Sequence, residues 1–560
     1  MSSSLIRIGL LGLPFAASFS AYAADPAEAN TVVLPTVNVT GEAEAEGYKA
    51  DTASTAKTDT PLRDVPQSIS VITRQTMDDL NTQNIGEAMQ YVPGVGMAQG
   101  EGNRETPVIR GNSSTGDFFL DSMRDDVQYY RDLYNIERVE VLKGPNGALF
   151  GRGGVGGLIN RVSKEAGFDP LRKLSLQLGS YNDRRIAADL GQGLTDRVAV
   201  RLNTMYEDTD SYRDDVTLER YGVNPTMTWL ASDRTKVVFG AEYFHDERIA
   251  DRGVPSFQGK PIDTSRGTFF GNPDESPTDT TVKQANLLVE HRFSDSVVLR
   301  NRTRYADYDK YYANVFPGAV NTQPVNGNPP GTVVSISAYG QATQRQNFFN
   351  QTDLNFVANT GRIVHKFLTG VELGQQDTDN FRETGYFDSE SPGQTSVTVP
   401  VSNPRTTLPI SWRQSATDAD NTSTADIAAP YIQDEIVFTP AFQLLLGLRY
   451  DRFEVDFTNK RTAVDLSSTD DLFSPRAALV FKPTASVSAY ASYSLTYQPR
   501  AGEQLASLSA TNAALDPEEF TNYEIGLKWD ASKRLAFTAA LFQLERTNVA
   551  VADPNVILAR

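Results

Sequence analysis

Strict alternation of side-chain type decides the fold, and it is clearest in Val487-Ser488-Ala489-Tyr490-Ala491-Ser492-Tyr493-Ser494-Leu495-Thr496-Tyr497-Gln498. Successive side chains of a β-strand point to opposite faces, so the odd-numbered apolar and aromatic residues share one face. The opposite face carries Ser488, Ser492, Thr496 and Gln498. The same period of two returns at residues 174–178, 198–206, 237–243 and 444–450. The sequence therefore predicts a mainly β chain.

The polar face of these strands indicates a membrane barrel. It carries charged and amide side chains such as Arg201, Asn203, Glu242, Arg449 and Asp451. The dry core of a soluble sandwich would not tolerate these groups unpaired, whereas a barrel turns its apolar face to lipid and its polar face to the lumen. We expect a large antiparallel transmembrane β-barrel over residues 171–560, with roughly fifteen strands of about ten to fifteen residues. A stack of soluble β-sandwiches is the alternative.

The connections between the strands also fit a membrane barrel. Tight turns are expected at Gly179–Asp183, Ala231–Arg234 and Asp530–Lys533, and long polar loops at 245–280, 310–345 and 376–425. Outer-membrane barrels have short turns on the periplasmic side and longer loops outside. Tyrosines near strand ends fit an interfacial aromatic girdle, namely Tyr206, Tyr243, Tyr450 and Tyr497.

The composition excludes several classes of protein. The 560 residues include 52 Lys and Arg, 70 Asp and Glu and no Cys, with a formal net charge of -18. An acidic chain without a basic face is a poor nucleic-acid binder, so we expect no nucleic-acid partner. The lack of cysteine excludes thiolate catalysis, disulfides and cysteine-ligated metal centres. A helical membrane protein is also excluded, because no apolar run near twenty residues follows the N-terminus.

The N-terminus has the pattern of an export signal. Arg7 precedes an apolar run at 8–19, and Ala21-Tyr22-Ala23 provides a small-x-small cleavage pattern, so 1–23 is predicted to be a signal peptide. Residues 24–60 form a polar segment that contains one β-prone island at 32–40. This island is either a linker or a strand offered to the sheet edge of a partner.

The sequence predicts a compact mixed α/β domain over residues 61–168. A strand is expected at Ser68–Thr73 and a helix over Thr76–Met89. Further short strands are expected at Pro107–Gly111, Phe118–Leu120 and Ile136–Leu142, before a glycine-rich stretch at 144–157.

Motifs of catalysis are lacking. Residues Gly151–Gly156 satisfy G-x-G-x-x-G, but a strand at 158–162 is expected to follow where a dinucleotide fold needs a helix, so close backbone packing explains these glycines better. The three histidines His245, His291 and His365 are far apart in sequence. We expect no enzyme, no resident metal and no cofactor. The acidic pairs look like solvated loop charges, at 78–79, 125–126, 214–215 and 470–471.

The segment Arg124–Tyr134 interleaves arginine with tyrosine on one predicted loop. Guanidinium groups, aromatic faces and phenol donors together suit a rigid, anionic, aromatic or oxygen-rich ligand. A solvated loop with incidental tyrosines is the alternative.

Several ordered motifs are similar to those of a known family. The run Ile136-Glu137-Arg138-Val139-Glu140-Val141-Leu142-Lys143-Gly144-Pro145, continuing through 148–151 to 156–160, closely resembles the plug signature of TonB-dependent outer-membrane receptors. Residues 64–73 and Ile109-Arg110-Gly111 resemble two further plug motifs, and 515–528 resembles a barrel segment. The plug is most similar to the ferric-siderophore branch, particularly catecholate-type receptors. The resemblance implies a mixed α/β plug inside the barrel.

The resemblance also implies roles for particular residues. An island that resembles the TonB box, which TonB pairs with by strand addition, consists of Leu34, Pro35, Thr36, Val37, Asn38, Val39 and Thr40. The positions where plug apex loops contact the ferric chelate are Arg104, Gln128, Tyr129, Tyr130 and Arg131. Arg110 and Lys143 lie where such plugs pair electrostatically with the barrel, with Glu524 as the candidate partner. Ordinary buried pairing of Arg110 and Glu524 is the alternative.

One departure from the family concerns the barrel. Related barrels have about 22 strands, whereas residues 171–560 supply roughly fifteen. The last predicted strand, Leu535–Leu544, is followed by Val556-Ile557-Leu558-Ala559-Arg560 without a C-terminal aromatic residue. We therefore expect an incomplete barrel, truncated at the C-terminus, from a fragment or frameshifted product of a longer receptor.

The leading functional hypothesis is active import of a ferric siderophore across the outer membrane of a Gram-negative bacterium. The implied partners are TonB with its ExbB–ExbD motor, the ferric siderophore and outer-membrane lipid, for a monomeric receptor in which iron enters only as cargo. One alternative is a barrel-anchored surface protein that binds without transport. Another keeps the transport mechanism but takes haem, a cobalamin or a glycan.

Overall fold

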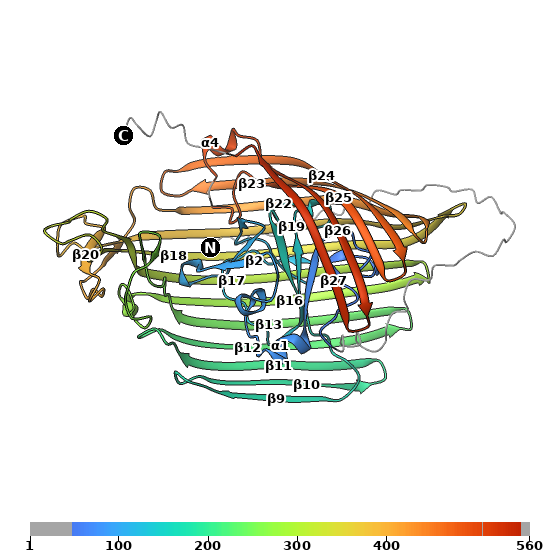
Figure 1. The fold of residues 1–560 in the computed structure, drawn as a ribbon, viewed down its shortest axis with the longest axis horizontal. Coiled ribbons are helices and arrows are strands. Elements are labelled where there is room, and N and C mark those ends of the chain that lie inside the picture. Colours follow the sequence, from blue (N-terminus) through green and yellow to red (C-terminus); the bar gives the residue numbers. More distant parts are fainter. Residues whose placement is uncertain (1–46, 507, 550–560) are drawn as a thin grey trace. The chain divides into compact units, whose positions relative to one another are not determined.

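The computed structural model describes residues 47–506 and 508–549 of the chain (Figure 1). The predicted signal peptide and the predicted TonB box lie outside the described residues. Two groups of elements follow one another along the described chain, first short helices and strands up to Ser163 and then long strands from Leu171.

Residues up to Ser163 form the plug, which is drawn mainly in blue to teal in Figure 1. Its elements are α1 (Arg74–Asp79), α2 (Ile85–Met89), α3 (Gly147–Phe150), β1 (Ile69–Thr73), β2 (Val95–Ala98), β3 (Thr106–Ile109), β4 (Asn112–Ser113), β5 (Phe118–Leu120), β6 (Met123–Arg124), β7 (Ile136–Lys143) and β8 (Gly157–Ser163). One sheet has the order β1-β7-β8-β5-β6, and a smaller one has the order β2-β3-β4. The predicted strands at β1, β3, β5 and β7 are confirmed.

The plug core explains why these elements pack together. Alternate residues of β7, Val139 and Val141, point into an apolar cluster with Ile159 of β8 and Met77 of α1. All four side chains are fully buried, and each contributes about 1.5–3 kcal/mol of burial free energy relative to an exposed position.

The prediction of one continuous helix over Thr76–Met89 was wrong. The structure has two short helices separated at Leu80–Asn84, where Asn81 adopts a left-handed backbone. The side chain of Asn84 caps α2 by accepting a hydrogen bond from the Glu87 amide at 2.9 Å. Asparagine favours caps and turns over helix interiors because its side chain competes for backbone groups.

The remaining long strands form an antiparallel barrel. They are β9 (Leu171–Leu178), β10 (Arg184–Thr195), β11 (Val198–Asp210), β12 (Thr217–Ser232), β13 (Thr235–Ile249), β16 (Pro277–Ser294), β17 (Val297–Val320), β18 (Val333–Thr360), β19 (Ile363–Tyr386), β22 (Asp420–Thr439), β23 (Phe442–Asn459), β24 (Val464–Thr484), β25 (Val487–Gln498), β26 (Glu518–Ser532) and β27 (Leu535–Thr547). Within the described residues these are fifteen strands, in agreement with the sequence prediction. Two short strands, β20 (Ser396–Pro400) and β21 (Ser411–Arg413), pair with the long-loop ends of β18 and β19 respectively.

Neighbouring strands pair in the order β9, β10 and onward to β27, and no register among the described residues joins β27 to β9, so the incomplete barrel stays a prediction. These two terminal strands are the most exposed, with Leu178 of β9 85% exposed and Leu541 of β27 73% exposed. The smaller elements are the hairpin β14 (Ser256–Phe257) and β15 (Lys260–Pro261), the turn helix α4 (Ala510–Ala513) and 3-10 turns at Ser54–Ala56, Gly100–Gly102 and Pro273–Glu275. No helix among the described residues is long and apolar enough to cross a bilayer.

The polarity of the barrel wall is inverted relative to a soluble protein. Strand β12 alternates strictly, with Val223 and Trp229 exposed and Asn224 and Thr228 buried. On β11, Leu202 and Tyr206 are exposed while Asn203 and Glu207 are buried. The predicted alternation is confirmed, and an apolar outer face with a polar inner face is the pattern of a membrane barrel.

The two ends of the barrel differ in the length of the connections between their strands. At one end, the turns from β10 to β11, β12 to β13 and β26 to β27 each contain two residues. At the other end, the connections include 250–276, 321–332, 387–419 and 499–517. The predicted asymmetry is confirmed, but Gly179–Asp183 was wrongly grouped with the tight turns, because the β9–β10 connection lies at the end of the long loops.

Strands β17, β18 and β19 are longer than the sequence predicts. They contain 24, 28 and 24 residues and include most of the predicted loop at 310–345 and the first eleven residues of the one at 376–425. At about 3.3 Å per residue, such strands exceed a bilayer core of about 30 Å. Their outer ends have an apolar core of their own, which includes Phe270, Val334, Ile336 and Phe387. Polar composition alone made these extensions look like loops.

The glycine-rich stretch seats the plug against the barrel wall. A β-carbon at Gly147 would lie 2.5 Å from the Leu495 carbonyl oxygen of β25, and within the plug one at Gly156 would lie 2.1 Å from the Ile109 carbonyl oxygen of β3. Strand β8 follows the glycines, so the predicted strand and the close-packing explanation are confirmed.

Candidate functional site: the plug network and the apex cluster

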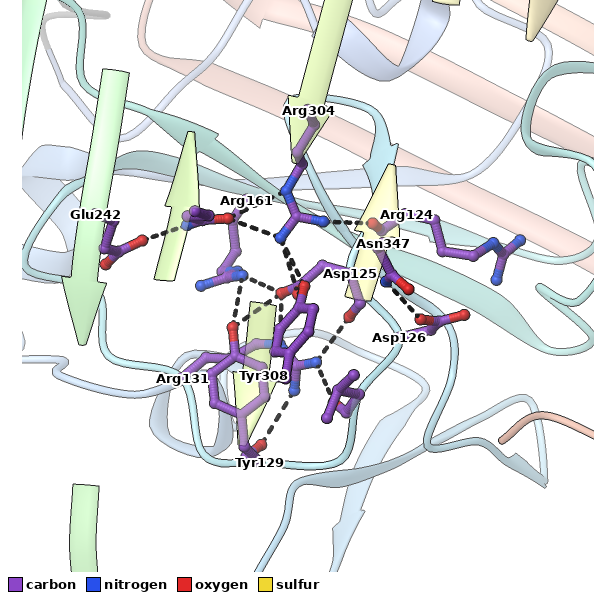
Figure 2. A network of polar contacts seen from close by, with 12 residues as sticks. Arg124, Asp125, Asp126, Tyr129, Arg131, Arg161, Glu242, Arg304, Tyr308 and Asn347 are labelled. Atoms are coloured by element: carbon purple, nitrogen blue, oxygen red, sulfur yellow. Dashed lines mark hydrogen bonds and ion pairs between the residues drawn. The ribbon is translucent and has the colours of Figure 1, made fainter. Parts of the chain in front are cut away.

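A buried network of charges holds the plug inside the barrel (Figure 2). At its centre, Asp125 accepts hydrogen bonds from Arg131 Nε at 3.0 Å and from Arg304 Nη2 of β17 at 3.1 Å. Arg161 of β8 and the Tyr308 hydroxyl also donate to this carboxylate. Burial alone would raise the pKa of Asp125. The surrounding guanidinium groups instead hold this pKa far below its usual range, and they belong to Arg131, Arg304 and Arg161.

The neighbouring carboxylate of Asp126 pairs with different strands. It accepts from Arg345 Nη1 of β18 at 3.2 Å, from Gln376 Nε2 of β19 at 3.0 Å and from Asn347 Nδ2 at 3.4 Å. Two consecutive plug residues therefore bind three successive barrel strands.

One sequence prediction about this segment was wrong, and two of the predicted ligand residues are buried, so their contact with a ligand stays a prediction. Asp125 and Asp126 are not solvated loop charges but are 0% and 1% exposed, and Asp470 of another predicted loop pair is also buried. Tyr129 and Arg131, predicted to contact ligand, are buried in the same network, where Arg131 lies 3.9 Å from the ring centre of Phe118. Buried charges need partners, and arginines on β8, β17 and β18 that are remote in sequence provide them.

The predicted pair Arg110 and Glu524 joins the plug to β26. Their side chains are 3% and 1% exposed and form an ion pair. The Glu524 carboxylate also accepts from the Ser68 amide at 3.0 Å and from the Tyr490 hydroxyl at 2.6 Å. Lys143 is half-buried nearby, where burial and the Arg110 charge lower its pKa. The structure therefore brings the three predicted residues together.

A second group of charged and aromatic residues lies at the long-loop end of the lumen. We call it the apex cluster, and it consists of Glu101, Arg104, Arg252, Tyr312, Phe316, Tyr339 and Arg382. Glu101 and Arg104 come from the plug, Arg252 comes from the β13–β16 loop, and the others come from β17, β18 and β19. A cavity of about 480 Å³ beside it is lined by Gln99, Glu101, Arg252, Ser256 and Pro317 among others.

Cations and aromatic rings alternate in the apex cluster. Arg382 lies 3.9 Å from the ring centre of Tyr339, and Arg252 lies 4.0 Å from that of Phe316. Tyr312 and Tyr339 meet edge to face at 5.8 Å. Such geometry suits a ligand that is both aromatic and anionic, because it offers ring faces and guanidinium donors together.

The other predicted ligand residues lie near this cluster. Lys310 donates to the carbonyl oxygens of Asn103 at 3.0 Å and Gln128 at 2.7 Å, which joins the segments that carry Arg104 and Tyr130. Gln128 donates to the Thr115 hydroxyl at 2.8 Å, and the Tyr130 ring lies 4.0 Å from Arg248. Ligand contact by Arg104, Gln128 and Tyr130 stays a prediction.

The barrel residues of the apex cluster were missed by sequence reasoning. Arg252, Tyr339 and Arg382 fall in stretches that were interpreted as polar loops. One available signal is the density of tyrosine and cationic residues around 304–312, which exceeds that of a solvated loop.

A larger cavity lies between the plug and the barrel wall, near the end with the tight turns. It has a volume of about 720 Å³ and is lined by plug residues such as Ser163 and by Thr226, Gly240 and Arg302 of the barrel. The wall across the lumen is in close contact with the plug, as at Gly147 and Leu495. The plug is therefore packed tightly on one side and loosely on the other.

The three histidines make no common site. His245, His291 and His365 contact Thr281, Thr235 and Asp434 respectively. Within 47–506 and 508–549, no group of His, Asp and Glu side chains is arranged to hold a metal ion.

A plug held by buried ion pairs inside a barrel with an apolar outer face defines a gated outer-membrane receptor. Two family descriptions match, the TonB-dependent receptor plug domain over residues 61–158 and the TonB-dependent receptor-like β-barrel over residues 228–558. The chain belongs to the TonB-dependent receptor family and is an outer-membrane protein.

Similar proteins include several siderophore receptors. The chain is 30% identical to the probable TonB-dependent siderophore receptor PiuA of Acinetobacter baumannii, covering 93% of this chain and 74% of the relative. It is 28% identical to the catecholate siderophore receptor Fiu of Escherichia coli, covering 90% and 71%. The crystal structure of PiuA superposes with a TM-score of 0.80 at 28% identity, covering 89% and 75%. The closed form of Fiu superposes with a TM-score of 0.79 at 26% identity, covering 89% of this chain and 76% of that structure.

Proposed function

We propose that this receptor imports a ferric siderophore across the outer membrane, and that the apex cluster is its first binding site. The observation that supports this proposal is the alternation of guanidinium groups and aromatic rings at the long-loop end of the lumen. A ferric catecholate has anionic oxygens for the guanidinium groups and flat rings for the tyrosines. The names of the relatives PiuA and Fiu support this class of cargo.

Transport requires energy from outside the receptor. The island Leu34–Thr40 supplies a strand to TonB, which draws on the ExbB–ExbD motor, and the plug then rearranges within the barrel. Alternating valines suit strand addition, because main-chain hydrogen bonds provide the affinity and one face of the strand provides the contacts. The receptor acts as a monomer, with iron as cargo and no resident cofactor.

Uptake of radioactive iron as a ferric tris-catecholate tests this function. Cells with the wild-type receptor should accumulate iron only while the proton gradient is intact. Val37→Pro should abolish uptake and leave chelate binding unchanged, because proline removes an amide from the paired strand. Thr31→Pro, outside the island, is the matched control. Binding without energy-dependent accumulation by the wild type would instead support a binding protein without transport.

A second kind of metal chelate should be tested in the same assay, because the name of another relative suggests it. The chain is 29% identical to the metal-pseudopaline receptor CntO of Pseudomonas aeruginosa, covering 93% of this chain and 74% of the relative. A metal chelate with carboxylate ligands would use the arginines of the apex cluster but not its ring faces. Competition between the two chelates for binding would identify the preferred cargo.

A further inference from the structure

The turn that carries Glu101 has an unusual backbone. Gly100, Glu101 and Gly102 all have left-handed φ angles, of 66°, 58° and 75°. A left-handed conformation costs a non-glycine residue about 1–2 kcal/mol, so contacts elsewhere must hold Glu101 there. Gly102 fits closely against the barrel loop, since a β-carbon there would lie 2.5 Å from the Asp251 amide nitrogen.

Three of the contacts that hold the turn converge on the Glu101 carboxylate, while Lys310 bonds Asn103 and Gln99 bonds the Asp251 carbonyl oxygen. It pairs with Arg104 of the plug at 2.7 Å and with Arg252 of the β13–β16 loop at 3.3 Å, and it accepts from the Tyr339 hydroxyl of β18 at 2.7 Å. Burial would raise the pKa of Glu101, but Arg104 and Arg252 lower it below its usual range. The carboxylate is therefore ionised at neutral pH.

The arginines have more donors than Glu101 satisfies. The Nε atoms of Arg104 and Arg252 are buried without hydrogen-bond partners. Unsatisfied buried donors are costly, and they are expected where a ligand completes the hydrogen bonding. One protein carboxylate therefore occupies a cationic and aromatic site that has capacity for further anionic oxygens.

We propose that Glu101 is an internal counter-ion which the anionic oxygens of the chelate displace from Arg104, Arg252 and Tyr339. Displacement removes the Glu101 contacts between the turn at 99–103 and the barrel, and so converts ligand binding into a movement of this part of the plug. This inference rests on the proposed function, because it assigns the trigger within the same site.

The physical basis is competition for the same donors. A bound chelate and Glu101 cannot both occupy the guanidinium groups, because two anions close together in a partly buried site repel one another. Once displaced, the Glu101 side chain no longer offsets the cost of its left-handed backbone. Ligand binding therefore favours a second conformation of the turn, and the coupling is limited by the difference in affinity for the two conformations.

Neutralising the counter-ion tests the first half of the proposal. Glu101→Gln keeps the size of the side chain and removes its charge. The purified full chain should bind a trianionic ferric tris-catecholate about tenfold more tightly or better, while affinity for a neutral ferric tris-hydroxamate should stay unchanged. Asp388→Asn, which removes a loop carboxylate paired with Arg413 at 2.6 Å, is the charge-matched control and should change neither affinity.

The outcomes separate the inference from the proposed function. If the wild type binds neither ferric chelate, the proposed function fails. If the wild type binds the catecholate and Glu101→Gln binds it with unchanged affinity, the counter-ion role is overturned alone. In an Arg252→Ala background the gain from Glu101→Gln should shrink, because one of the competed donors is gone.

A fluorescent reporter tests the second half. The chain has no cysteine, so Ala98→Cys, at an exposed position next to the turn, accepts a single environment-sensitive label. Ligand should change the label's emission in the wild-type background, and Glu101→Gln without ligand should already show most of this change. Emission identical to that of the ligand-free wild-type background would overturn the trigger.

Discussion

Asp125 and Asp126 are neighbours in the chain, yet their carboxylates pair with different arginines. Asp125 faces Arg131, Arg161 and Arg304, whereas Asp126 faces Arg345 at 3.2 Å. Two adjacent residues thus connect the plug to several barrel strands, and both side chains are buried. Removing one partner of a buried pair costs more than the pair contributes, because it leaves an uncompensated charge.

Asp125→Asn should destabilise the plug by about 3–5 kcal/mol, since three arginines lose their common counter-ion. Hydrogen exchange of plug amides in the full receptor would measure the change. Asp78→Asn is the control, because Asp78 forms partly exposed ion pairs with Arg74 at 2.9 Å and with Lys173 of β9, and their loss should cost about 1 kcal/mol or less. Equal effects of the two variants would contradict the central role of Asp125.

The pair Arg110 and Glu524 should control how firmly the plug is attached to β26. Arg110→Ala leaves the Glu524 carboxylate buried without its cation, so the plug should be about 3–5 kcal/mol less stable. The double variant Arg110→Ala with Glu524→Gln should recover part of this loss, because the stranded charge is gone. Protease cleavage of the plug in intact outer membranes would measure both. Additive losses would show that the two residues act independently.

Glu105 should make plug stability depend on pH. Burial outweighs the effect of Arg131 and raises the pKa of Glu105 from 4.5 to about 7. A raised carboxyl pKa stabilises the fold below the unfolded value of 4.5 and loses this contribution as pH rises through 7. Relative to Glu105→Gln, the wild-type plug should lose about 3 kcal/mol between pH 4 and pH 8.

Hydrogen exchange of the β7 amides at several pH values would compare the Glu105→Gln variant with the wild type. The comparison isolates Glu105, because the other carboxylates are common to both proteins. A constant difference between pH 4 and pH 8 would contradict the assignment.

Arg104 and Tyr130 should contribute jointly to chelate binding. Their segments are joined through Lys310, and together they supply a guanidinium and a ring face. Arg104→Ala with Tyr130→Ala should weaken binding of a ferric tris-catecholate about tenfold or more, which corresponds to 1.4 kcal/mol or more. Equilibrium binding to the purified receptor would measure it, with Tyr181→Ala in the β9–β10 connection as control. Wild-type affinity in the double variant would remove these residues from the site.

The cavity of about 720 Å³ should be part of the route past the plug. A β-carbon at Gly240 would meet Thr226 Cγ2 at 3.4 Å and nothing closer, so Gly240→Trp should project into the cavity. Uptake should be abolished while chelate binding persists. Ala241→Trp on the opposite face of β13 is the matched control and should transport normally. Normal uptake by Gly240→Trp would place the route elsewhere.

The barrel and the plug strands could be predicted from the sequence because their signals are local. A period of two in 487–498 places side chains on two faces whatever the partner strand is, and polar residues on one face exclude a soluble core. The run 136–160 likewise matched a plug because its hydrophobic pattern and its glycines are contiguous.

Only the tertiary structure decided which charges are buried and with which partners. Asp125 and Asp126 have the composition of a solvated pair, and their burial depends on arginines of β8, β17 and β18 that the barrel brings to the plug. Glu101 meets Arg252 and Tyr339 only because the register of β13 and β18 places their ends above the plug. The sequence by itself determined a plugged membrane barrel, because alternation and glycine packing are properties of short segments. The site required the tertiary fold, because ion pairing depends on distances between residues that are far apart in the chain.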